Sequence, residues 1–260
     1  YWRAWNSQSI PDFRDKRIIE MANYKYNPWP IGKLPPNWRR SELEEIKKLG
    51  YNWDDPRNII DMFETKIAEY CGSKFAVSVD CCSHGLFLAL KYFSTFGPKN
   101  KYVTIPKNTY MSVPMQIIHS GHKINFNNKQ WSGIYQLEPY PIWDAAARFT
   151  KNMYIQDSIM ILSFQIKKRL PIGRGGMILT NNETAYNWFK KSSYDGRDLT
   201  KPYDIDQPTF LGYHFYMTPE DAARGIILFD QLPEKNKDIA NWKNYTNLSK
   251  LDIFRNQQDE

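Results

Sequence analysis

Short apolar segments of strand length alternate with longer amphipathic segments along much of the chain, and this alternation limits the possible folds more than any other feature. Residues 75–79 are short and rich in Val, as expected for a strand. In residues 59–70 the apolar side chains fall on one helical face, and Gly72 follows as a stop signal. The same reasoning predicts strands at residues 102–105, 123–126, 141–143, 159–164 and 177–180, and helices at residues 40–49, 86–93, 111–119 and 218–232.

Interleaved strands and helices predict an α/β fold with three layers, α/β/α, in which helices cover both faces of a mostly parallel sheet. Residues 1–57 are rich in Trp, Pro and Asn, and we interpret them as an irregular N-terminal arm that packs on the main domain. Residues 58–232 form that main domain. Residues 233–260 form a short C-terminal segment with a polar, frayed end.

The chain of 260 residues carries a formal net charge of +7 and has a pI near 9.1, which favours anionic partners in general. Its longest apolar runs are strand-sized, far below the roughly 18 to 20 residues that a membrane-spanning helix needs. Residues 1–6 lack the apolar core of a signal peptide. We therefore expect a cytoplasmic protein without a membrane partner.

The three cysteines, Cys71, Cys81 and Cys82, are too few for a disulfide framework and lack the paired spacing of a zinc site. Adjacent cysteines can form a redox pair, but small buried residues are the preferred interpretation of Cys81 and Cys82. The sequence therefore predicts no metal site.

Polar residues follow several of the predicted strands, where open α/β sheets bind ligands. Ser83 lies between a strand and a helix, so its hydroxyl can either cap the helix or help to hold an anion there. Residues 108–110 follow another strand. Asp144 ends an apolar strand, and because a buried carboxylate is costly we expect a cationic or hydrogen-bond-donating partner for it. A structural salt bridge is the alternative role of Asp144.

A basic loop follows the strand that ends near Ser163, and three glycines lead out of this loop into the strand at residues 177–180. The glycines match neither GxGxxG nor GxxxxGK, so the sequence predicts neither a Rossmann dinucleotide site nor a nucleotidase phosphate loop. They indicate a turn where another part of the backbone comes close.

The order of these motifs resembles the DegT/DnrJ/EryC1/StrS sugar aminotransferases, and the resemblance covers roughly residues 61–232. The family's DAA motif looks like Asp144, Ala145 and Ala146 in this chain. The strongest match is to SFHxxK followed by GxGG, which resembles Ser163, Phe164, Gln165 and Lys168 and then Gly173, Gly175 and Gly176.

This resemblance implies a fold type I enzyme that uses pyridoxal 5'-phosphate, with residues 58–232 as the cofactor-binding large domain. By this match Lys168 is the Schiff-base lysine and Lys167 is its neighbour. Asp144 pairs with the pyridine nitrogen of the cofactor, and the Ser163 hydroxyl contacts its phosphate.

Further segments resemble the family more loosely. Its SGT-type turn corresponds to Cys82 and Ser83, which places Ser83 at the phosphate, although Cys82 stands where glycine is common. Tyr110 corresponds to the aromatic residue that stacks on the cofactor ring. The family's GxNxRM motif resembles residues 212–217, but His214 replaces its asparagine and a tyrosine replaces its arginine. The resemblance thus implies a homodimer in which His214 reaches the phosphate bound by the partner.

The chain also departs from the family. It is too short between Phe126 and Trp143 for the family's further strand, helix and loop, and little remains after Leu232 for a C-terminal domain. We therefore expect a compact variant with a remnant C-terminal segment and a reduced substrate-binding region.

The leading interpretation is an aminotransferase that converts the keto group of a sugar linked to a nucleotide diphosphate into an amine, with glutamate as the donor that the resemblance implies. Such a reaction belongs to the biosynthesis of amino sugars and polysaccharides. A second interpretation is a degenerate, non-catalytic or regulatory member of the same fold. A basic nucleic-acid-binding protein, suggested by the pI and by aromatic residues among Lys and Arg, has the lowest weight because no recognised motif supports it.

Overall fold

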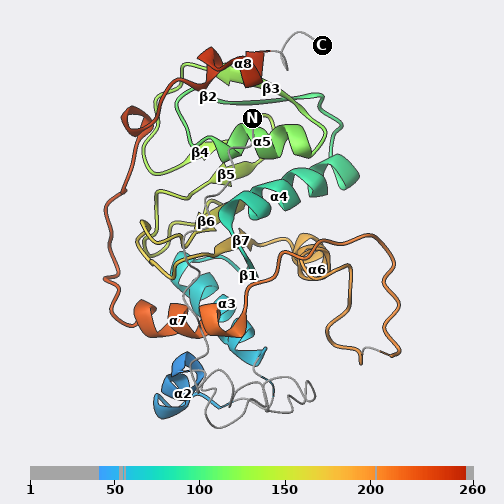
Figure 1. Cartoon of the computed structure of the whole chain (residues 1–260), viewed down its shortest axis with the longest axis vertical. Coiled ribbons are helices and arrows are strands. Elements are labelled where there is room, and N and C mark those ends of the chain that lie inside the picture. The colour runs from blue at the N-terminus through green and yellow to red at the C-terminus, as the bar shows by residue number, and fades with distance from the viewer. Residues whose placement is uncertain (1–40, 53–54, 56, 203, 256–260) are drawn as a thin grey trace, which may run out of the picture. The chain divides into compact units, whose positions relative to one another are not determined.

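The computed structural model describes residues 41–52, 55, 57–202 and 204–255, which belong to one compact unit of residues 40–260 (Figure 1). Most of the expected N-terminal arm, residues 1–40, lies outside the described residues. The described part of it contains the predicted helix, α2 (Ser41–Lys48), which packs against α7 through Leu43 and Ile46. A domain boundary at residue 57 stays a prediction.

The strands predicted from the sequence are all present. One sheet has the strand order β1-β7-β6-β5-β4, and β2 pairs with β3 beside it. The strands are β1 (Phe75–Val79), β2 (Tyr102–Pro106), β3 (Lys123–Asn127), β4 (Tyr135–Gln136), β5 (Ile142–Asp144), β6 (Ile159–Ser163) and β7 (Gly176–Thr180). Of these, β4 was not predicted.

Most of these strands run in one direction, as predicted. β5 is parallel to β6, and β2 is parallel to β3. β1 points the same way as β6, because both are antiparallel to β7, which lies between them. Among the described strands, β4 and β7 run the other way. The carboxyl ends of β1, β5 and β6 therefore meet at one edge of the sheet, where α/β sheets of this kind bind ligands.

Helices cover both faces of the sheet, which confirms the three layers (Figure 1). Along β6, Met160 and Leu162 belong to the core under α3 and α7, whereas Ile159 and Ile161 belong to the core under α4, α5 and α6. Burial on both faces explains the continuous apolar run of this strand. The helices are α3 (Asn58–Cys71) and α7 (Pro219–Phe229) on one face, and α4 (Cys82–Phe96), α5 (Ser112–His119) and α6 (Glu183–Ser192) on the other.

Two helix ends form as their residue types predict. Gly72 ends α3 in the left-handed conformation, with a φ of 81°. Thr218 caps α7, because its hydroxyl accepts a 3.2 Å hydrogen bond from the Asp221 N–H, and Pro219 occupies the first helical position. The helix α6 was not predicted from the sequence, and few of its side chains are buried.

The segment between β3 and β5 is as short as the sequence indicates, and it joins the two parts of the sheet. β4 pairs with β5. Just beyond β4, Glu138 exchanges backbone hydrogen bonds of 2.8 and 3.0 Å with Thr104 of β2. One antiparallel segment therefore links β5 to β2, without a helix between β3 and β5.

The described part of the segment after α7 runs along the fold and reaches β2 and β3 (Figure 1). The Leu248 N–H donates to the Lys107 carbonyl at 2.8 Å, and the ring of buried Phe254 lies 6.0 Å from that of Phe126. Up to Arg255 this polar segment is therefore held by isolated apolar side chains in buried positions, and the expected frayed end at residues 256–260 lies outside the described residues. The segment contains η1 (Trp242–Asn244), η2 (Leu248–Lys250) and α8 (Asp252–Arg255).

Membrane-spanning candidates were sought among the helices of the described residues. None of these helices is both long enough and apolar enough to cross a bilayer.

Candidate functional site

A buried carboxylate, Asp144, lies at the carboxyl end of β5. Its Oδ2 atom accepts a 2.6 Å hydrogen bond from the hydroxyl of Tyr135, directly opposite on β4. Its Oδ1 atom accepts a 2.9 Å hydrogen bond from the Ala146 N–H. Thr109 extends this network, because its hydroxyl is hydrogen-bonded to that of Tyr135. Asp144 thus has the donor partners expected for it, and within the described part of the chain it forms no salt bridge.

The partners of Asp144 only partly offset the cost of burying its negative charge, as the direction of its pKa shift indicates. Burial raises this pKa, and the hydrogen bonds from Tyr135 and Ala146, together with the charge of Lys168, lower it without cancelling the effect of burial. A protonated nitrogen beside the carboxylate would supply the missing compensation. The surroundings of Asp144 therefore fit a cofactor whose ring carries such a nitrogen, as pyridoxal phosphate does.

The loop after β6 presents one of its two adjacent lysines to this carboxylate. Backbone hydrogen bonds to and from Gly173 close the loop. Lys168 is half-buried, and its positive charge acts on both Asp144 and Cys82. Lys167 is exposed. This geometry favours Lys168 over Lys167 as the residue that meets a cofactor, and its role as the Schiff-base lysine stays a prediction.

Gly176, the first residue of β7, brings Ser163 close to the start of α4. It lies opposite Val79 of β1 on one side and opposite Ser163 of β6 on the other. A Cβ atom at Gly176 would lie 2.6 Å from the backbone nitrogen of Cys82, so a glycine is needed for this approach. The close backbone approach that the glycines indicate therefore occurs at Gly176.

The start of α4 offers backbone N–H groups to an anion. Its N-cap residue, Cys81, makes no side-chain capping bond, and no acidic residue lies in the first turn. The cap role considered for Ser83 is wrong, because Ser83 lies inside the helix and its hydroxyl is hydrogen-bonded to that of Ser112 at 2.8 Å. Uncapped N–H groups at the positive end of a helix dipole fit a phosphate group, with the hydroxyls of Ser83 and Ser163 in the same part of the site.

The adjacent residues Cys81 and Cys82 lie in or next to a group of possible metal ligands. Burial and the nearby Asp144 raise the pKa of the Cys82 thiol, so this side chain stays neutral. Asp80, Cys81 and His84 place three possible metal ligands within 4.8 Å of one another. However, Asp80 and His84 are hydrogen-bonded to each other at 2.6 Å, which satisfies both groups without a metal.

Two tyrosines that sequence reasoning missed belong to the same site. One is Tyr135, the donor to Asp144. The other is Tyr245 of the C-terminal segment, whose carbonyl accepts a 2.8 Å hydrogen bond from the Asn108 amide. Burial raises the pKa of Tyr245, as do Asp144, Tyr110 and Cys82 to a lesser extent. No motif marks either tyrosine in the sequence, because each reaches the site from a segment without a regular pattern.

Two further predicted site residues, Tyr110 and His214, are exposed. Tyr110 is 61% exposed and acts on the pKa of Tyr245, which places it at the solvent side of the site. His214 is exposed, and its Nδ1 atom is hydrogen-bonded to the Asp195 carboxylate at 3.0 Å. Among the described residues, His214 contacts Asp195 and two tyrosines, and it does not contact Asp144. Its role toward a second subunit stays a prediction.

Comparison with known proteins identifies the family of this chain. Residues 39–152 and 150–256 match the DegT/DnrJ/EryC1/StrS aminotransferase family. The chain is 35% identical over 251 residues to the spore coat polysaccharide biosynthesis protein SpsC of Bacillus subtilis (strain 168), a match that includes 76% of this chain and 63% of that protein. The chain thus spans less than two thirds of the length of this relative.

Solved structures share the fold. AtS13 from Actinomadura melliaura matches with a TM-score of 0.62 and 18% identity, over 73% of this chain and 64% of that one. A putative PLP-dependent aminotransferase from Bacillus cereus ATCC 10987 matches with a TM-score of 0.58 and 21% identity, over 81% of this chain and 65% of that one. At these identities the likeness shows the fold alone, which is that of the fold type I transferases. Together with the match over most of its length, this fold shows that the chain belongs to the DegT/DnrJ/EryC1/StrS aminotransferase family.

Proposed function

We propose that this chain binds pyridoxal phosphate at the carboxyl edge of its sheet and converts the keto group of a nucleotide-linked sugar into an amine. The observation that carries the proposal is the buried carboxylate of Asp144, which has two hydrogen-bond donors and lies under the influence of the Lys168 charge. Membership of an aminotransferase family supports the reaction class. Glutamate as the donor and a cytoplasmic location are further parts of the proposal, based on the sequence.

The name of the relative SpsC refers to polysaccharide biosynthesis, which supports a sugar substrate. The structurally similar PseC of Helicobacter pylori, with a TM-score of 0.57, 13% identity and coverage of 74% of this chain and 63% of that one, is described as an aminotransferase of pseudoaminic acid biosynthesis. Neither name specifies the sugar that this chain would use. The substrate class therefore rests on the family, and the chemistry rests on the residues of the site.

Each residue of the site has a defined task in this proposal. When bound, pyridoxal phosphate supplies an electron-accepting ring that stabilises the negative charge left when a carbon loses its proton. Ionised Asp144 would keep the ring nitrogen protonated, while Tyr135 and Ala146 hold the carboxylate in place. The Nζ atom of Lys168 would take the proton from the substrate carbon and return it, as a general acid and base.

The phosphate and the ring would be held by different elements. The N–H groups at the start of α4 would bind the phosphate, with the hydroxyls of Ser83 and Ser163 as further donors. Tyr110 is exposed at the site and would stack on the ring. Cys82 would contribute a small, neutral side chain close to Asp144 and Lys168.

We include a homodimer in the proposal, with His214 reaching the phosphate bound by the partner. His214 is exposed, and because its Nδ1 atom already faces Asp195, its Nε2 atom is available as a donor to a phosphate oxygen. A closed pair with twofold symmetry is the commonest assembly. Light scattering that shows a monomer would contradict the dimer, and a dimer whose cofactor affinity is unchanged by His214→Ala would contradict the histidine role.

The decisive experiment is the variant Asp144→Asn. The wild-type chain is expected to turn yellow with pyridoxal phosphate and to aminate a nucleotide-linked keto sugar. The variant keeps the shape of the side chain but cannot hold a proton on the ring, so turnover should fall by about two orders of magnitude or more at unchanged circular dichroism. Unchanged turnover would remove Asp144 from the reaction. Cofactor binding without any turnover in the wild type would favour the non-catalytic alternative.

A further inference from the structure

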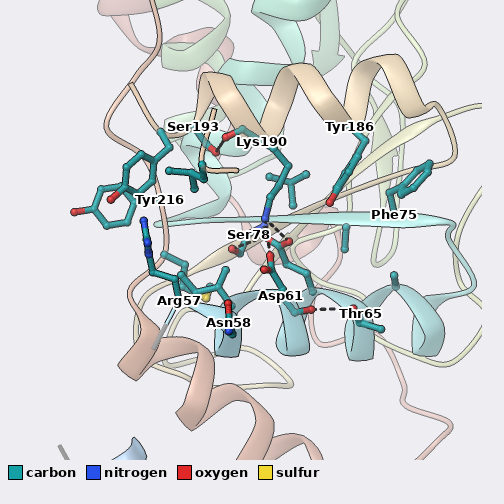
Figure 2. A pocket seen from close by; sticks show the side chains of 18 of the residues that line it. Arg57, Asn58, Asp61, Thr65, Phe75, Ser78, Tyr186, Lys190, Ser193 and Tyr216 are labelled. Carbon is teal, nitrogen blue, oxygen red and sulfur yellow. Dashed lines mark hydrogen bonds and ion pairs between the residues drawn. The ribbon is translucent and has the colours of Figure 1, made fainter. Parts of the chain in front are cut away.

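A cavity lies at the edge strand β1, between α3 and α6 (Figure 2). Its volume is about 650 Å³, which falls within the range of small-molecule sites. Ser83, Asp144, Ser163 and Lys168 do not line it. A ligand bound in this cavity would therefore be separate from the proposed cofactor.

A partly buried ion pair lies at this edge of the sheet. Glu64 on α3 accepts hydrogen bonds from the N–H and the hydroxyl of Ser78, at 2.7 and 2.8 Å, and so takes the place of a further strand beside β1. Lys190 reaches from α6 to Glu64 and to Asp61, at 2.9 Å each, and its side chain crosses the cavity in Figure 2. Burial alone would lower the pKa of Lys190, but the two carboxylates raise it, so the bridge between the helices stays charged.

The charges at the cavity favour a ligand without negative charge. Lys190 is paired as described, and the guanidinium of Arg57 pairs with the carboxylate of Asp55. These cations are therefore not free to bind a phosphate. The charged side chains that line the cavity are the acids Asp55, Asp61, Glu64 and Glu69 and the bases Arg57, Lys74 and Lys190, of which Lys74 is exposed and lies over the ring of Phe75. The four acids and three bases together give the lining a net charge of −1, which disfavours a nucleotide or another anion.

Tyr186 offers the cavity a hydroxyl that the protein does not use. The hydroxyl points into the cavity in Figure 2 and has no hydrogen-bond partner among the described residues. Its ring is stacked on that of Phe75, with the centroids 4.6 Å apart, so the hydroxyl is held in a defined place. Burial raises the pKa of Tyr186, which keeps it protonated. Asn58 and Tyr216 add an amide and a second hydroxyl to the lining, next to apolar side chains such as Met217.

We propose that this cavity binds an uncharged, hydroxyl-rich ring of the size of a hexose unit, at a site separate from the cofactor. Sugar hydroxyls both donate and accept hydrogen bonds, which matches the hydroxyl of Tyr186 and the amide of Asn58. The C–H face of a sugar ring can pack on the aromatic and apolar part of the wall. Because the lining carries a net negative charge, this site does not fit the anionic nucleotide part of a substrate.

The test is saturation-transfer NMR and calorimetry on the full chain with pyridoxal phosphate present, using glucose, N-acetylglucosamine and uridine monophosphate as probes. At least one of the two sugars is expected to bind. Tyr186→Phe keeps the ring on Phe75 and removes the hydroxyl, so it should raise the Kd for that sugar about 2- to 10-fold. The matched variant Tyr102→Phe, at an exposed position on β2, should leave the Kd unchanged.

A third variant distinguishes the two sites. Lys168→Ala changes the cofactor site only, so sugar affinity should be the same as in the wild type. Loss of sugar binding in Lys168→Ala would assign the sugar to the cofactor site and overturn the proposal. Failure of both sugars to bind at tens of millimolar, a Kd unaffected by Tyr186→Phe, or tighter binding of uridine monophosphate that depends on Tyr186 would overturn it as well.

Discussion

Tyr135 and Asp144 face each other across β4 and β5, and the tyrosine hydroxyl donates a 2.6 Å hydrogen bond to the buried carboxylate. Burial raises the pKa of both groups, and the charge of Asp144 raises that of Tyr135 further. Tyr135 therefore stays protonated and acts as a donor. The short strand β4 thus holds the carboxylate of the proposed cofactor site in place. It lies in the segment where the chain is too short for the further strand, helix and loop of the family.

The first prediction concerns the variant Tyr135→Phe. The hydrogen bond from Tyr135 lowers the pKa of Asp144, so its loss should raise this pKa and leave the carboxylate ionised only at higher pH. We expect the acidic limb of the pH profile of kcat to move to higher pH. A hydrogen bond to a charged group contributes about 1.5 to 3 kcal/mol, so kcat should fall about 10- to 100-fold.

The matched control for this experiment is Tyr102→Phe, which removes the hydroxyl of an exposed tyrosine on β2. It should leave both kcat and the pH profile unchanged. A Tyr135→Phe variant with a normal acidic limb would show that the hydroxyl does not tune Asp144.

The second prediction identifies the lysine that bonds to the cofactor. Borohydride reduction of the chain with pyridoxal phosphate should attach the label to Lys168, which is half-buried and lies near Asp144 and Cys82. Lys167 is exposed and should remain unlabelled. Peptide mapping by mass spectrometry locates the label, and Lys167→Ala is the control that should still be labelled. Label on Lys167, or on neither residue, would refute the assignment.

Segments buried on both faces could be predicted from the sequence alone. The apolar runs of β6 and β7 mark them as central strands, and Gly72 and Thr218 mark helix ends by their backbone and capping chemistry. In contrast, β4 is only two residues long, and α6 buries three of its ten residues, Ala185, Phe189 and Ser192. Such elements depend on tertiary contacts more than on their own pattern.

The residues of the site also divide into those that the sequence could predict and those that it could not. Asp144 and Ser163 end apolar strands, and Lys168 lies in the loop after β6, so the sequence could predict which elements carry them. Tyr135 and Tyr245 could not be predicted, because their roles depend on how distant segments pass the ends of the strands. The contacts of Tyr245 come from a C-terminal segment whose sequence has the composition of a polar tail.

The third prediction concerns Gly176→Ala. The new methyl group would lie 2.6 Å from the backbone nitrogen of Cys82 and would displace the start of α4. Overpacking of this kind costs about 1 to 3 kcal/mol of unfolding free energy. Cofactor affinity should also fall, because the N–H groups proposed to bind the phosphate move. The control is Gly121→Ala, which has a φ of 91° but open space around it, and which should cost stability without changing cofactor affinity. Equal cofactor affinity in both variants would contradict the prediction.

The start of α4 also contains a group whose charge should make stability depend on pH. The Nδ1 atom of His84 is hydrogen-bonded to Asp80 at 2.6 Å, and the imidazole ring is stacked on Phe215, with the centroids 3.8 Å apart. Arg174 binds the other oxygen of the Asp80 carboxylate at 2.8 Å. Burial by itself would lower the pKa of His84, but its hydrogen bonds to Asp80 and Cys81 more than offset this and raise the pKa to about 9.

The fourth prediction follows from the sign of this shift. The folded chain holds the proton of His84 more tightly than the unfolded chain, whose histidines titrate near pH 6.5. The stabilisation is therefore fully present below pH 6.5 and is lost as the pH rises through about 9. Urea unfolding at pH 6 and at pH 9.5 should show a lower unfolding free energy at the higher pH, and His84→Gln should reduce the difference. His119→Gln, at an exposed position at the end of α5, should preserve it. If His84→Gln loses as much stability between the two pH values as the wild type does, the Asp80 and His84 pair does not cause the pH dependence.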